Sequence, residues 1–96
     1  MVLEIARFSI VPGQEDDFTL AYAKGRELLV QTPGCRTIRM TRGIESPSIF
    51  ILMVEWDSVE DHEVGFRGSD RFPAWRTLLS PFFAEPPAVE HYADLP

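Results

Sequence analysis

The stretch SIFILMVEW, residues 48–56, limits the possible folds more than any other part of the chain. Side chains alternate between two faces along a strand, and here both faces are apolar. One face carries Ile49, Ile51 and Met53, and the other carries Phe50, Leu52, Val54 and Trp56. A strand of this kind must be covered on both faces.

A chain of 96 residues is one small domain that cannot cover both faces by itself. Its two predicted helices can cover one face of a sheet. A second copy of the same sheet is the simplest cover for the other, which predicts a homodimer joined through the sheet faces. The alternative is that the C-terminal segment folds over the second face.

The remaining elements follow from periodicity and turn signals. Ala6, Phe8 and Ile10 share one face of the first strand, and Glu4 is the charged residue that interrupts this set. The second helix begins at Ser58, weakens at Gly65 and Gly68, and restarts near Ser69. We predict strands over 2–11, 35–43, 48–56 and 88–93, with helices over 14–31 and 58–82. The order β-α-β-β-α-β is the ferredoxin-like pattern of the α+β class, a four-stranded antiparallel sheet with helices on one face.

Composition excludes several classes of function. A net charge of −6 disfavours nucleic acid, and no apolar run reaches membrane-spanning length. The single cysteine, Cys35, excludes a disulfide framework and a multi-cysteine zinc site. The N-terminus MVLEIARFSIV has neither a basic leader nor a small-residue cleavage site, so we expect no signal peptide and a cytoplasmic protein.

Five segments occur together and in order: VPGQEDDF, TPGCRTIRMTRG, FILMVEWDSVEDH, SDRFPAW and EPPAVEHY. With them the chain resembles the antibiotic biosynthesis monooxygenase (ABM) family of dimeric α+β barrels over nearly its whole length, as a single domain over 1–96. The resemblance implies a homodimer with a pocket between the sheet and the helices of each subunit. It also implies oxygenation of a hydroxylated aromatic or quinol without a cofactor, in which the substrate is its own reductant.

His62 is the candidate catalytic residue, because it matches the histidine of a family segment that reads WDSVEDH here. Val59, His62 and Phe66 share one helix face. His62 is either a base or hydrogen-bond donor in the pocket, or a strut that ties the helix to the core edge. Many relatives carry a second histidine one turn later, where this chain has Gly65 and Phe66, which argues against a metal.

The candidate substrate-binding residues are Phe66, Trp75, Phe82, Tyr22 and Arg39. The aromatic side chains either hold a flat ring or simply pack in the core. Arg39 either binds an anionic substrate or pairs across the dimer interface with Glu4 or Glu55.

His91 is interpreted as structural or interfacial. No acidic pattern joins the two histidines into a metal cage, so we expect no metal. Haem degradation is also rejected, because the first strand lacks the asparagine that the haem-degrading branch of the family carries. The matching tryptophan and iron-ligand histidine are missing as well.

Two other classes of function stay open on the sequence. One is a non-catalytic dimeric module that binds a small apolar molecule, and the other is an isomerase of a small metabolite. No glycine-rich phosphate loop supports a phosphorylated substrate.

Overall fold

The elements follow the predicted order in a computed structural model that describes residues 1–96. Their bounds differ from the predicted ones mostly by one or two residues, as helix and strand ends commonly do. The elements are β1 (Val2–Ser9), α1 (Glu15–Val30), β2 (Cys35–Arg42), β3 (Ile49–Trp56), a π-helical turn η1 (Asp61–Phe66), α2 (Arg71–Leu79), a 3₁₀ turn η2 (Ser80–Phe82) and β4 (Ala88–Tyr92).

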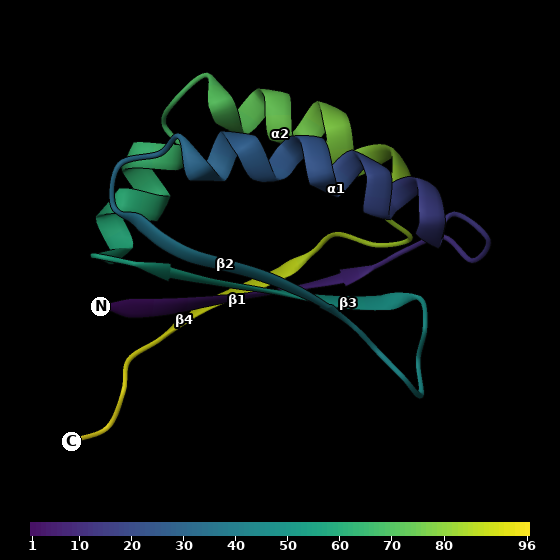
Figure 1. Cartoon of the computed structure of the whole chain (residues 1–96), viewed down its shortest axis with the longest axis horizontal. Coiled ribbons are helices and arrows are strands. Elements are labelled where there is room, and N and C mark those ends of the chain that lie inside the picture. The colour runs from purple at the N-terminus through teal and green to yellow at the C-terminus, as the bar shows by residue number, and fades with distance from the viewer.

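The four strands form one antiparallel sheet in the order β2-β3-β1-β4. Both helices lie side by side on the same face of this sheet, and the other face carries no helix (Figure 1). The predicted α+β, ferredoxin-like class is therefore confirmed. Because β1 and β3 are central, their side chains on the helix side form the middle of the core.

The core lies between the sheet and the two helices. β1 and β3 each present alternate residues to it, as the sequence predicts for Ala6, Phe8 and Ile10. Burying a large apolar side chain of this kind contributes roughly 1.5–3 kcal/mol. The largest fully buried side chains are Trp56, Phe18, Phe66, Ile10, Leu29, Leu52, Leu79 and Val54.

The opposite face of the sheet stays uncovered in a single chain. Ile49, Ile51 and Met53 are half-buried there by their neighbours on the sheet alone. The C-terminal segment does not fold over them: β4 pairs with β1 at the sheet edge, and Leu95 beyond it is 92% exposed. Neither α-helix combines the length and the apolar character needed to cross a membrane.

The segment predicted as a second helix is divided in two. The break at Gly68 is confirmed, whereas Gly65 lies inside the first part. That part contains a π-helical turn, with the amide of Arg67 donating to the carbonyl of His62 at 2.9 Å. A Cβ on Gly68 would lie 2.4 Å from the carbonyl oxygen of Val64, so this close chain reversal requires glycine. The predicted cap is present, because the amide of Asp61 donates to Ser58 Oγ at 3.2 Å.

Candidate active site

Glu4 is a carboxyl group placed among apolar side chains. It lies on the core face of β1 and is only 4% exposed. Trp56 Nε1 donates a hydrogen bond to Glu4 Oε1 at 2.9 Å. The sheet register explains this contact: Glu4 is paired with Val54 on β3, and Trp56 follows Val54 on the same face.

Burial raises the pKa of Glu4 from its ordinary 4.5 to about 7. The bond from Trp56 and the charge of Arg67 act in the opposite direction, and the charge of Glu63 adds to the rise. A carboxyl group with this pKa exchanges its proton near neutral pH, which is what a general base requires.

His62 lies directly behind Glu4, on η1. Its Nε2 is 3.4 Å from Glu4 Oε1, and its ring stacks on Trp56 with centroids 5.1 Å apart. Burial is the main cause that lowers the pKa of His62 to about 4, and the charges of Arg67 and His91 act in the same direction. The imidazole is therefore neutral at pH 7, so its 3.4 Å contact with Glu4 is not an ion pair there.

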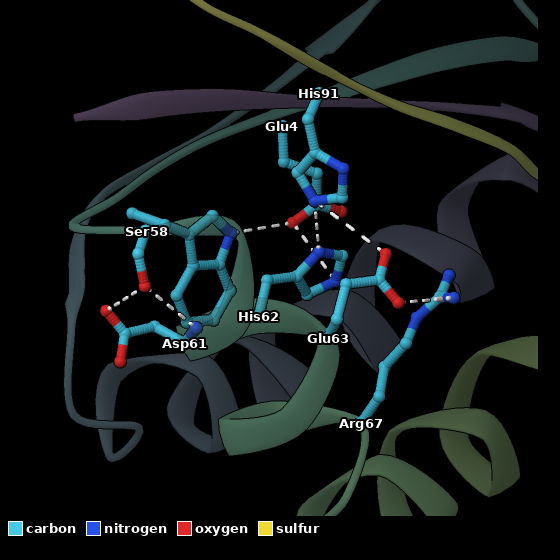
Figure 2. A network of polar contacts seen from close by, with 8 residues as sticks. Glu4, Ser58, Asp61, His62, Glu63, Arg67 and His91 are labelled. Atoms are coloured by element: carbon cyan, nitrogen blue, oxygen red, sulfur yellow. Dashed lines mark hydrogen bonds and ion pairs between the residues drawn. The ribbon is translucent and has the colours of Figure 1, made fainter.

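His91 completes a line of polar groups that runs to the surface. β4 places His91 opposite Glu4 in the sheet register, and its Nε2 is 2.8 Å from His62 Nδ1. Farther out, Glu63 Oε1 is 3.9 Å from His91 Nε2, and Glu63 Oε2 is 3.4 Å from Arg67 Nη1. Figure 2 shows these side chains converging from β1, β4 and the π-helical turn.

The same groups are the only set whose geometry resembles a metal site. Ligand atoms of His62, Glu63 and His91 all lie within 4.8 Å of one another. The two ring nitrogens, however, are 2.8 Å apart. Two histidines on one tetrahedral zinc, each bound at about 2.0–2.1 Å, would place them roughly 3.3 Å apart. Glu63 is also engaged with Arg67, so the arrangement is that of a hydrogen-bonded pair of imidazoles.

A cavity of about 700 Å³ opens beside Glu4, between the sheet and α2. Its walls are mainly aromatic, with Phe8, Phe66, Phe72, Trp75 and Phe83 among them. Two cations, Arg67 and Arg76, also line it. The volume and lining suit a flat aromatic molecule with an acidic group.

The family model described as antibiotic biosynthesis monooxygenase matches residues 1–78. The chain belongs to this family. YczJ of Bacillus subtilis (strain 168), an uncharacterized protein, is 35% identical over 95 residues, which cover 99% of this chain and all of YczJ.

Solved structures share the fold. A Bordetella bronchiseptica protein provisionally assigned as an antibiotic biosynthesis monooxygenase is 39% identical, with a TM-score of 0.94 over 98% of this chain and 96% of that one. SnoaB, a cofactor-independent oxygenase from Streptomyces nogalater, is 14% identical, with a TM-score of 0.86 over 99% and 93%. At that identity the likeness to SnoaB shows the fold alone.

Within this ABM-family fold, the predicted site residues do not all come together. Phe66 and Trp75 line the cavity, whereas His62 stands behind Glu4 and not in the cavity wall. Phe82 packs toward Phe18, and its neighbour Phe83 faces the cavity and stacks on Phe8.

Tyr22 and Arg39 lie elsewhere. Tyr22 borders a separate hollow with Met40 and Phe50, next to α1. Arg39 pairs in register with Met53, on the uncovered face of the sheet. Of the two interface partners predicted for Arg39, Glu4 is wrong because its side chain is buried in the core, and the pairing with Glu55 stays a prediction.

Sequence reasoning missed Glu4 as a site residue, although a signal was present. A lone carboxyl on the otherwise apolar face of a strand has a high desolvation cost unless a partner or a function holds it there. It also treated His62 and His91 as separate, and it did not foresee that Glu63 would lie near both.

Proposed function

We propose that this ABM-family protein oxidises a hydroxylated aromatic or quinol with O2, without a cofactor, and that Glu4 accepts the substrate proton. The observation that carries the proposal is the position of Glu4. It is a buried carboxyl with a pKa of about 7 at the wall of an aromatic-lined cavity. Such a group is a base at neutral pH that has no need of a metal to activate it.

The proposed reaction balances with O2 as the oxidant. For an anthrone, the Glu4 carboxylate takes one proton from the reacting CH2 group, and the resulting anion passes one electron to O2. The substrate radical and superoxide combine to form a C–O bond, and protonation gives a hydroperoxide. Loss of water from the hydroperoxide leaves a carbonyl, so CH2 and O2 become C=O and H2O.

The cavity walls support this chemistry. Phe66 and Trp75 offer apolar surfaces on which a ring can stack. Arg76 lines the cavity and has no carboxylate partner, so its charge is available to stabilise the anion that deprotonation creates. His62 acts through Glu4 in this proposal, because both of its ring nitrogens face other side chains of the protein.

We further propose that the protein works as a homodimer in the cytoplasm. Ile51 and Met53 support the dimer, since they need a cover that the chain does not supply. The unpaired Cys35 is consistent with a reducing compartment.

Oxygen uptake tests the proposal. We would compare the wild-type protein with Glu4→Gln on a panel of anthrones, naphthols and quinols, with Glu27→Gln on the outer surface of α1 as the matched control. Loss of a positioned base typically lowers turnover about 10²–10⁴-fold, and we expect a fall in this range for Glu4→Gln alone. Equal uptake by Glu4→Gln and wild type would remove Glu4 from the reaction. Tight binding by the wild type without uptake would identify a binding module instead.

A further inference from the structure

We propose that His62 and His91 form a proton path that joins Glu4 at the cavity to Glu63 at the surface. The inference rests on the proposed function, since it concerns how Glu4 releases the proton that it accepts. The successive separations are 3.4 Å from Glu4 to His62, 2.8 Å from His62 to His91 and 3.9 Å from His91 to Glu63. No other buried polar groups in the chain are connected in this way to an exposed carboxylate.

Glu4 needs such a path because its other surroundings are closed. The carboxyl is 4% exposed, and Trp56 occupies one side of it. A bound aromatic ring would fill the cavity side and exclude water from it. The only remaining polar neighbour within reach is His62, whose ring is equally buried.

The His62 imidazole passes a proton on by accepting one at one ring nitrogen while it gives one up at the other, so the ring does not stay charged. Protonated Glu4 gives its proton to His62 Nε2 while His62 Nδ1 passes its own proton to His91 Nε2. His91 then releases a proton to Glu63 or to water, so one proton enters, one leaves and no electron moves. The reverse transfer restores the first tautomer of His62 and returns to Glu4 the proton that the peroxide anion takes up.

Two charged neighbours act on Glu4 in opposite directions: Arg67 favours release of its proton, and Glu63 raises its pKa and opposes release. Arg67 contacts Glu63 at the outer end, and its charge lowers the pKa of both Glu4 and His62. The remaining titratable group near Glu4 is the Cys35 thiol, whose pKa is raised to about 11 by burial and by the charge of Glu4. Cys35 is thus protonated throughout the neutral range and does not compete for the proton.

A kinetic experiment tests the path where a substrate is oxidised. We expect His91→Gln to lower kcat at least tenfold with KM changed less than twofold, and we expect added imidazole to restore kcat. Glu27→Gln, an exposed position on α1 away from the path, is the control and should behave as the wild type. A loss that imidazole does not restore, or one that lies in KM, would overturn the path.

A second experiment is independent of turnover and separates this inference from the proposed function. In ¹⁵N NMR spectra of the imidazoles, His62 should be the Nδ1–H tautomer below the pKa of Glu4 and the Nε2–H tautomer above it. Glu4→Gln should abolish this switch while the backbone amide spectrum stays folded. A switch in a protein that oxidises no substrate would retain the path and reject the oxygenase. A single tautomer at every pH would overturn the path, whatever the activity.

Discussion

At the scale of single residues, one physical cause sets the chemistry of the site. Burial disfavours charge, so it raises the pKa of the Glu4 carboxyl and lowers that of the His62 imidazole. Between about pH 4 and pH 7 both groups are therefore neutral, although an isolated glutamate and histidine would be charged over much of that range. The pair is prepared to exchange a proton and not to form a salt bridge.

The raised pKa of Glu4 predicts a pH-dependent stability. The folded state holds the Glu4 proton up to about pH 7, whereas the unfolded chain loses it near 4.5. The stabilisation that the bound proton gives the folded state is fully present below pH 4.5 and is lost as the pH rises through 7. Glu4→Gln removes it, so the stability of the variant relative to the wild type should improve by about 2–3 kcal/mol between pH 5 and pH 8.

Urea unfolding at both pH values measures this difference. Glu27→Gln is the control and should show no change with pH relative to the wild type. The lowered pKa of His62 makes the stability rise with pH below pH 6.5. This effect is present in both proteins and largely cancels in the comparison. A constant difference between Glu4→Gln and wild type would mean that Glu4 titrates normally.

Trp56 holds the pKa of Glu4 below the value that burial alone would give. Trp56→Phe removes the donor at 2.9 Å, and we expect the pKa of Glu4 to rise above 7. Carboxyl ¹³C NMR measures this pKa directly. Trp75→Phe is the matched control, because Trp75 is a buried indole without a bond to Glu4, and it should leave the pKa in place. A fall in the pKa of Glu4 in Trp56→Phe would contradict this account.

At the scale of elements, the sequence predicts the structure where a residue pattern fits only one kind of element. The alternation in β3 and the apolar set on β1 predict strands and their buried faces, because a period of two residues fits no helix. The π-helical turn was not predictable, since it shares its residue pattern with an α-helix and differs only in the spacing of its backbone hydrogen bonds. The meeting of His62 with His91 depends on β4 lying beside β1, which no local pattern encodes.

The turn before β2 fixes where the π-helical turn can lie. Gly34 has φ +88°, and a Cβ there would lie 2.4 Å from Asp61 Cγ. Gly13 has φ +94° with open space around it. Alanine at either position meets the same backbone strain of roughly 1 kcal/mol, and only Gly34→Ala also displaces Asp61 from Ser58.

We therefore expect Gly34→Ala to lose about 2–3 kcal/mol of stability and Gly13→Ala about 1 kcal/mol. Urea unfolding gives both values at one pH. Gly34→Ala should also shift the NMR resonances of His62, because Asp61 begins the turn that carries it. Equal losses in the two variants would show that Asp61 moves aside freely and that the contact positions nothing.

At the scale of the whole molecule, the fold leaves one face of the sheet, which carries Ile49, Ile51 and Met53, without a cover. The helices occupy one face of the sheet, and the other face carries no helix, with the C-terminal tail extending away on that side (Figure 1). The sequence predicts this need from β3 alone, since a strand that is apolar on both faces requires two covers. The second cover must come from another molecule. In a homodimer with twofold symmetry, the same sheet face of a second copy packs against the uncovered face.

Association through this face is open to a direct test. Sedimentation equilibrium of the wild type should give a mass of about twice the 10.9 kDa of one chain. Ile51 lies in the middle of the open face, paired in register with Arg7 and Thr41, so Ile51→Lys should convert dimer to monomer. Leu20→Lys is the control, because Leu20 is 67% exposed on α1 and should leave the mass unchanged. A lysine at position 51 is costly only if that face is covered, because only then is its charge buried. A monomeric wild type, or a dimer that only Leu20→Lys dissociates, would contradict the sheet-to-sheet arrangement.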